Sequence, residues 1–250
     1  TGVQLVSQNK KRIFEKDKSE YTFRTVNSLI NSAHHLKKRF EKLTIKFTIL
    51  DVNSPKTHIE KMLTRFNKEG FEVDHFPVKI DKNFKDNMST TMASIKHSFN
   101  LAKKCKDLIY FVEDDYIHKN EALTEMLFAY EKFCSIYQNE IFILSTDYPY
   151  LYKKMNSSNI LIGENTHWRT VKESLLTFMT SKKMVEKYFD KLIDMTTRQS
   201  DPFEKNLHEI YEQEKCLSPI PSLSVHCTNI NSVFGISPNL NVKKIWDENK

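Results

Sequence analysis

The sequence is poor in the residues that dominate loops, fibres and disulfide scaffolds. Only 4 Gly and 7 Pro occur in 250 residues, which argues against a fibrous or loop-dominated protein. The four cysteines are scattered and form no Cys-x-x-Cys pair, so a zinc knuckle is not expected and the pattern fits a reducing compartment. They are Cys105, Cys134, Cys216 and Cys227.

Long apolar runs are also missing. No run approaches the roughly 20 residues of a membrane span, so we expect a cytoplasmic protein, either free or at the inner face of the membrane. The 38 basic and 32 acidic residues give a net charge of +6, and lysines and glutamates are mixed along most segments. We therefore expect a solvated surface and no nucleic-acid partner. A modest positive field would still favour anionic substrates such as nucleotide diphosphates, or peripheral association with an anionic membrane.

Several nucleotide and hydrolase motifs are absent. The sequence contains no Gly-x-Gly-x-x-Gly, no Gly-x-x-x-x-Gly-Lys-Ser/Thr and no Gly-x-Ser-x-Gly. A Rossmann dinucleotide site, a P-loop and a hydrolase elbow are therefore not supported.

The first 118 residues alternate between strand and helix patterns. Apolar strand-like runs are separated by segments with apolar residues at helical spacing, and this alternation predicts an α/β fold with a mostly parallel central sheet flanked by helices. The expected strands are 3–7, 45–50, 71–78 and 108–112. The expected helices lie within 21–36, 54–69 and 92–102.

The second half is less regular but contains no linker or repeat. Helix patterns begin near Asn120, which we expect to be the N-cap, near Ser181 and near Pro202, and strand patterns cover 141–145 and 174–180. We expect one domain over residues 1–250, with a nucleotide-binding half (3–118) and an acceptor-binding half (119–250).

Three consecutive carboxylates directly follow a buried strand. The run Leu108-Ile109-Tyr110-Phe111-Val112 is followed by Glu113, Asp114 and Asp115, and such crowding is unfavourable unless a positive charge lies nearby. Mg²⁺ or Mn²⁺, which bind one or two carboxylates together with substrate phosphates, would supply that charge. Acidic residues near the N-terminus of the following helix are the structural alternative.

The order of these features resembles a GT-A-fold glycosyltransferase, a Rossmann-like fold. The stretch "VEDDY" matches the Glu-Asp-Asp variant of that family's Asp-x-Asp motif, and "ILDVNSP" resembles its strand-Asp turn. The resemblance implies that Asp115 binds the metal, that Glu113 and Asp114 belong to the nucleotide-sugar site, and that Asp51 contacts the base or ribose. It covers about residues 3–130.

Shorter matches extend the resemblance. The late His226 in "PIPSLSVHC" corresponds to a histidine that reaches the metal or diphosphate in many such enzymes; a satisfied core histidine is the alternative. In "THWRTV", Arg169 is a candidate for binding a phosphate or a carboxylate sugar. Asn9 and Lys11 follow the first expected strand, in a loop that often touches the nucleotide.

The stretch "SDPFEKNLHEIY" supplies candidates for a catalytic base. Asp201 and Glu204 stand at an expected helix start, where inverting members place the carboxylate that deprotonates the acceptor. A capping box, with Asp201 as N-cap and Pro202 at the first helical position, explains the same residue types structurally.

The resemblance therefore implies a glycosyltransferase that depends on Mn²⁺ or Mg²⁺ and contributes to polysaccharide biosynthesis. It would move a sugar from a nucleotide-sugar, with UDP as the default nucleotide, to a glycan or lipid-linked acceptor with inversion. Two alternatives stay open: a Mg²⁺-dependent phosphotransferase or hydrolase using the same carboxylates, and a noncatalytic module on this scaffold.

Overall fold

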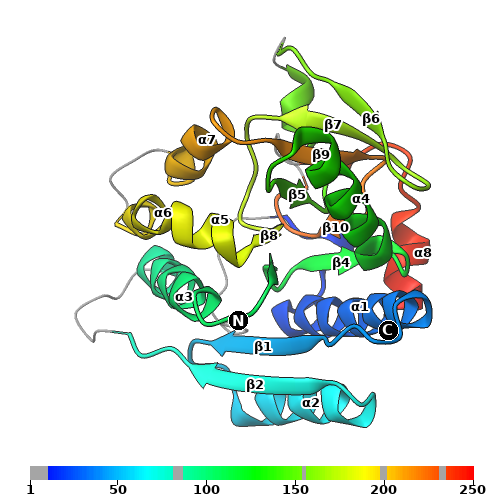
Figure 1. Cartoon of the computed structure of the whole chain (residues 1–250). Helices are drawn as coiled ribbons and strands as arrows, with labels where there is room; N and C mark the ends of the chain where they lie inside the picture. The colour runs from blue at the N-terminus through cyan, green and yellow to red at the C-terminus, as the bar shows by residue number, and fades with distance from the viewer. Residues whose placement is uncertain (1–10, 81–86, 154–155, 198–201, 231–234) are drawn as a thin grey trace.

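The computed structural model describes residues 11–80, 87–153, 156–197, 202–230 and 235–250. In these ranges the chain is an α/β protein (Figure 1). Its helices are η1 (Ile13–Glu15), α1 (Lys18–Arg39), α2 (Lys56–Lys68), α3 (Asn87–Ala102), α4 (Ala122–Tyr137), η2 (Pro149–Lys153), α5 (Lys182–Lys187), α6 (Phe189–Met195), α7 (Lys205–Tyr211) and α8 (Val242–Glu248). Its strands are β1 (Lys46–Asp51), β2 (Glu72–Pro77), β3 (Leu108–Phe111), β4 (Tyr116–His118), β5 (Phe142–Leu144), β6 (Ile160–Ile162), β7 (His167–Val171), β8 (Phe178–Ser181), β9 (Cys216–Ile220) and β10 (Ser224–His226).

The central sheet is mixed, which corrects the expectation of a mostly parallel sheet. Its six strands follow the order β3-β8-β5-β9-β7-β6, and only β5 and β9 pair in parallel. The parallel pair β1-β2 and the antiparallel pair β10-β4 form separate ladders. Strands β6 and β7 are joined by a short turn, and such connections produce antiparallel pairs. The partners of the other antiparallel pairs are far apart in the sequence, so the sequence pattern did not fix their relative direction.

Local signals explain some helix boundaries and fail at others. Gly70 adopts a positive φ of 75° just after α2, the left-handed conformation that glycine tolerates. The Ser181 side chain caps α5 by accepting a hydrogen bond from the Met184 amide at 3.2 Å. The expectation of an Asn120 cap is wrong, because Glu121 occupies the N-cap of α4. The helix expected from Pro202 begins at Lys205, with Glu204 as its N-cap.

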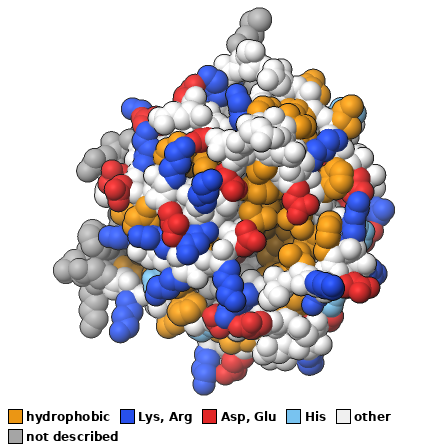
Figure 2. All heavy atoms as spheres, viewed as in Figure 1, with side chains coloured by type: hydrophobic (Ala, Val, Ile, Leu, Met, Phe, Trp, Pro, Cys, Tyr) orange, Lys and Arg blue, Asp and Glu red, His pale blue; other side chains and the backbone are white. Residues whose placement is uncertain are grey.

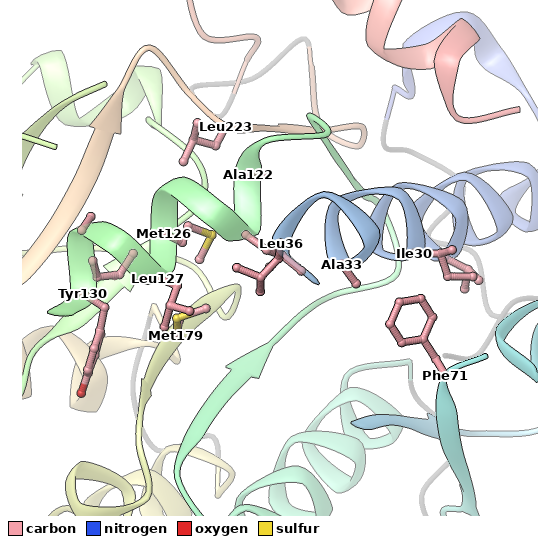
Figure 3. Packing of buried hydrophobic residues seen from close by; sticks show 14 of the residues in the cluster. Ile30, Ala33, Leu36, Phe71, Ala122, Met126, Leu127, Tyr130, Met179 and Leu223 are labelled. Carbon is pink, nitrogen blue, oxygen red and sulfur yellow. The ribbon is translucent and has the colours of Figure 1, made fainter. Parts of the chain in front are cut away.

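Two apolar cores lie on opposite faces of the central sheet. On one face, residues of α1 and α4 pack against alternate sheet residues such as Ile143 and Leu217. On the other face, α3 and the α5–α7 region pack against Phe142, Leu144 and Phe178. Adjacent residues of β5 point to opposite faces of the sheet, so the fold has helix, sheet and helix layers. Figure 3 shows the α1–α4 side, where Ile30, Ala33 and Leu36 lie near Phe71 and the α4 side chains.

A buried polar network anchors β4 between α1 and the sheet. The fully buried His118 ring lies 2.6 Å through Nε2 from the Tyr110 hydroxyl and 3.4 Å through Nδ1 from the Ser28 hydroxyl. Asn249 donates a hydrogen bond to the His118 carbonyl at 3.3 Å, which ties the end of the chain to the same strand. Since His118 lies three residues after Asp115 in the chain, this network holds the strand that leaves the acidic cluster.

The surface carries charges of both signs. Figure 2 shows lysines and arginines interspersed with aspartates and glutamates on the displayed face, around a hollow lined by apolar side chains. None of the helices in the described ranges combines the length and apolar character needed to cross a bilayer.

The β6–β7 turn is packed too closely to admit a side chain at Gly163. Glu125, 2% exposed, accepts hydrogen bonds from the amides of Glu164 at 2.9 Å and Asn165 at 3.0 Å, and from Trp168 Nε1 at 3.3 Å. A Cβ at Gly163 would overlap Glu125 Oε1 and lie 2.5 Å from Trp168 Nε1.

We therefore expect Gly163→Ala to lower the free energy of unfolding by about 1–3 kcal/mol, because the turn must shift away from Glu125. Urea denaturation monitored by tryptophan fluorescence measures this change. Glu125→Gln, which keeps the volume but removes the charge, should also destabilise the protein. A Gly163→Ala protein as stable as the parent would show that the turn relaxes freely.

Candidate functional site

The three carboxylates lie in the turn between β3 and β4 and are drawn toward the protein interior. Asp115 is 8% exposed, and the Asp114 side chain is 18% exposed. The Glu113 amide donates to the Thr177 hydroxyl at 3.1 Å, and that hydroxyl lies 3.4 Å from Glu113 Oε2. The cluster is therefore built into the protein rather than displayed as a solvated acidic surface.

Helix α1 supplies the positive partner of Asp114. Lys18 forms an ion pair with Asp114 Oδ1, and the Thr22 hydroxyl, one turn further along α1, donates to Oδ2 at 3.2 Å. Burial alone would lower the pKa of Lys18, but the charges of Asp114 and Asp115 outweigh it and raise the pKa. Both oxygens of Asp114 are thus engaged by the start of one helix.

The predicted meeting of His226 and Asp115 is present in the structure. His226 Nε2 lies 3.6 Å from Asp115 Oδ2, and its ring stacks on Tyr116 with centroids 4.7 Å apart. The antiparallel pairing of β10 with β4 sets this position, because His226 is opposite Tyr116 and the Cys227 amide donates to the Asp115 carbonyl at 2.9 Å. A β-ladder therefore brings a late histidine to the end of the acidic turn.

The pKa values of Asp115 and Glu113 are shifted in opposite directions because the neighbours of the two carboxylates differ. Burial would raise the pKa of Asp115, but His226 and Lys18 outweigh burial and hold the pKa well below its usual range. Burial and the negative charge of Asp115 raise the pKa of Glu113 to about 7. Neighbouring acids whose pKa values are pushed apart are typical of functional sites, although structural ion pairs produce the same effect.

Among the described residues, two buried polar atoms near this cluster have no hydrogen-bond partner. They are His226 Nδ1 and Arg12 Nε. Arg12 and Thr228 face each other across an antiparallel bridge, two residues beyond His226. An unpaired buried polar group costs about 1–3 kcal/mol, so an ordered water or a ligand is expected to satisfy these two atoms.

Of the two predicted base residues, the structure describes Glu204. Its side chain is buried, and its charge raises the pKa of both Glu113 and Tyr150, so it lies within electrostatic reach of the acidic cluster. The Glu204 carbonyl accepts from the Leu207 and His208 amides at the start of α7. Asp201 lies outside the described residues.

Asp51 is buried at the end of β1 and has a local structural role. Its Oδ2 accepts from the Ser54 amide at 3.0 Å, and its carbonyl accepts from the Val78 amide at 2.7 Å. In the parallel sheet that we expected, Asp51 at the end of the strand 45–50 and the acidic cluster at the end of the strand 108–112 would lie on the same edge. In the part of the chain that the structure describes, β1 pairs with β2 and β3 pairs with β8, so the two strands are not joined in one ladder.

The described contacts of the remaining predicted residues are with residues outside the acidic cluster. Arg169 Nη2 lies 2.8 Å from Asp147 Oδ1, and its guanidinium stacks 4.0 Å from the Tyr152 ring centre. Its charge is therefore already balanced by a buried carboxylate. Lys11 is exposed, and its carbonyl accepts from the Ile230 amide at 3.3 Å. Asn9 lies outside the described residues.

Sequence analysis did not identify Lys18, Thr22 and Asp147. The segment from Asn9 to Glu20 has the charge of a solvated loop, and α1 begins within it. A lysine and a threonine four residues apart on one helix face were the available signal.

Asp115 and His226 together fit a partial metal site. A carboxylate oxygen and an imidazole nitrogen are suitable Mn²⁺ ligands, and phosphate oxygens commonly complete such sites. Within the described ranges, no group of three or more His, Cys, Asp or Glu side chains is arranged to hold a metal. Any ion bound here would therefore depend on ligands from a substrate.

Comparison of the chain with protein-family models, with curated proteins and with solved structures finds no match.

Proposed function

We propose that the protein is a GT-A-fold glycosyltransferase that moves a sugar from a nucleotide-sugar to a glycan or lipid-linked acceptor. UDP is the first nucleotide to test. The observation that supports this proposal best is the contact of His226 with Asp115 at 3.6 Å. The family pattern brings a late histidine to the acidic motif, and the two residues are far apart in the sequence.

Asp115 and His226 are the residues that would hold Mn²⁺ or Mg²⁺. When bound, such an ion stabilises the negative charge that develops on a departing diphosphate. Asp114 is engaged by Lys18 and Thr22, so we assign it a supporting role. The low pKa of Asp115 keeps its carboxylate ionised, and therefore able to bind a cation, at neutral pH.

Glu204 is the described candidate for the base, and Asp201 is the other predicted one. In an inverting transfer the acceptor oxygen attacks the anomeric carbon, the bond from that carbon to the diphosphate breaks, and the acceptor proton passes to a carboxylate. The burial of Glu204 and its electrostatic coupling to Glu113 support this role.

A nucleotide screen tests the proposal. Thermal unfolding with UDP, GDP and CMP, each with Mn²⁺ and with EDTA, should show metal-dependent stabilisation by one nucleotide. A ligand present at 100 times its Kd stabilises the native state by about 2.7 kcal/mol. For a chain of this size, we expect Tm to rise by about 5–10 °C.

The alternatives predict different results. No shift with any nucleotide in the presence of metal would favour a noncatalytic module, in which the ion pair of Lys18 with Asp114 is purely structural. Hydrolysis of a simple phosphoester would favour the phosphotransferase or hydrolase.

A further inference from the structure

The start of α1 and the segment before it place two cations beside the acidic turn. Lys18 is held by Asp114, with side chains only 13% and 18% exposed. Arg12 lies close enough for its charge to lower the pKa of Lys18. Like charges inside a protein repel each other, so two cations in this position require nearby anions.

The hydrogen bonds that Lys18 makes with the described residues leave donors of its ammonium group unused. A lysine ammonium has three donors, and the Asp114 contact uses one of them. The negative charge of Asp115, the next residue after Asp114, also raises the pKa of Lys18. Asp114 thus holds the ammonium in place without saturating it.

The two unpaired atoms belong to Arg12 and His226, which are joined to the cluster through strand β10 and its continuation. Arg12 Nε is buried without a hydrogen bond, although its residue bridges to Thr228. His226, 9% exposed, contributes the unpaired Nδ1. Guanidinium and ammonium donors together match the acceptor oxygens of a phosphoryl group.

We propose that Lys18 and Arg12 form an anion subsite for a phosphoryl group beside Asp115 and His226, and that Asp114 positions Lys18 rather than binding a metal. A nucleoside diphosphate as the natural ligand rests on the proposed function. The affinity for phosphoryl oxygens does not, because it depends only on these side chains. The subsite therefore retains affinity for a diphosphate when no divalent cation is present.

Isothermal titration with inorganic pyrophosphate tests the subsite directly. The parent protein should bind pyrophosphate in EDTA and more tightly in Mn²⁺, with an affinity that falls as salt rises. Lys18→Met should weaken binding about tenfold in both conditions, because a charge-assisted hydrogen bond is lost. Lys38→Met, at the exposed C-terminal end of the same helix, is the matched control and should bind like the parent.

Two further variants separate positioning from folding. Asp114→Asn should weaken pyrophosphate binding by about threefold to tenfold, because Lys18 loses its anchor while the shape is kept. Arg12→Gln should weaken it about tenfold. Circular dichroism confirms that each variant is folded; if Lys18→Met unfolds, Lys18→Gln and Arg12→Gln give the decisive comparison.

The outcomes distinguish the subsite from the proposed function. Pyrophosphate binding that is absent in the parent, or unchanged in folded Lys18 and Arg12 variants, overturns the subsite. Binding of pyrophosphate but of no nucleotide would leave the subsite standing and remove the glycosyltransferase proposal. If nucleotide binding depends on Mn²⁺ but is unchanged by the Lys18 and Arg12 substitutions, the glycosyltransferase proposal stands and the subsite is removed.

Discussion

Asp115→Asn is expected to weaken Mn²⁺-dependent nucleotide binding by on the order of 100-fold or more. Outer-shell partners of metal ligands alone are worth about 10–100-fold, and Asp115 is assigned as a direct ligand. The substitution keeps the shape of the side chain but removes the ionised oxygen that faces His226 at 3.6 Å. Titration of the nucleotide identified by the thermal screen, with Mn²⁺ in excess, measures the loss.

The same substitution should lower stability without abolishing folding. The pKa of Asp115 is depressed in the native state, so its carboxylate stabilises the fold above its unfolded pKa, and this contribution is lost as the pH falls. Asparagine carries no negative charge, so the Asp115→Asn protein lacks this stabilisation at neutral pH. Asp107→Asn, an exposed position just before β3, is the matched control and should change neither property.

Two results would contradict the assignment of Asp115 to the metal. Parent-like nucleotide affinity in a folded Asp115→Asn protein would remove Asp115 from the site. Complete unfolding would indicate a structural carboxylate, and His226→Gln then becomes the informative variant. If that protein is folded and still binds nucleotide with the parent's dependence on Mn²⁺, the metal proposal fails.

His118 is expected to make the protein sensitive to acid. Burial lowers the pKa of His118 from an ordinary 6.5 to about 3. Between these values the unfolded chain binds a proton that the native state excludes, so the contribution of His118 to stability falls as the pH decreases. The slope is about 1.4 kcal/mol per pH unit, or about 5 kcal/mol over the whole window.

The contribution of Glu113 to stability changes with pH in the opposite direction, so it must be distinguished from the contribution of His118. Its pKa is raised to about 7, so its contribution is greatest below its unfolded pKa and is lost as the pH rises through 7. The difference between the parent and His118→Gln cancels the Glu113 contribution, since both proteins contain it.

Urea denaturation of both proteins between pH 6.5 and 4.5 measures the effect of His118. His118→Gln should be less stable at pH 7, because it disturbs the contacts with Tyr110 and Ser28. Its disadvantage should shrink by about 2–3 kcal/mol across the two pH units. A constant difference between the two proteins would mean that His118 titrates normally in the native state.

The crowding of three carboxylates after a buried strand has a partial explanation within the protein. Lys18 pairs with Asp114, His226 contacts Asp115, and the pKa of Glu113 rises to about 7. The cluster can therefore fold without a metal. His226 Nδ1 and Arg12 Nε have no hydrogen-bond partner among the described residues, and these atoms are one reason for proposing a ligand there.

Much of the local structure was predictable because it depends on neighbouring residues. The strand expected at 45–50 is β1, the strand expected at 108–112 is β3, and the helix after Pro55 is α2. Helical and strand periodicities are properties of short segments, and the caps at Gly70 and Ser181 are local as well. Strands β4, β6, β7, β9 and β10 were not predicted. They have three to five residues each, which is too short for a clear periodicity; β5 is as short but lies in a continuous apolar run.

By itself, the sequence determined the α/β class, the presence of the long helices and the position of the acidic turn. Only the tertiary structure decided that β3 pairs antiparallel with β8, that Lys18 neutralises Asp114, and that His226 meets Asp115. The physical reason is the sequence separation over which each interaction acts. A periodic apolar pattern selects a local backbone conformation, whereas ion pairs and strand neighbours join residues about 70 to 110 positions apart, whose proximity depends on how all the layers pack together.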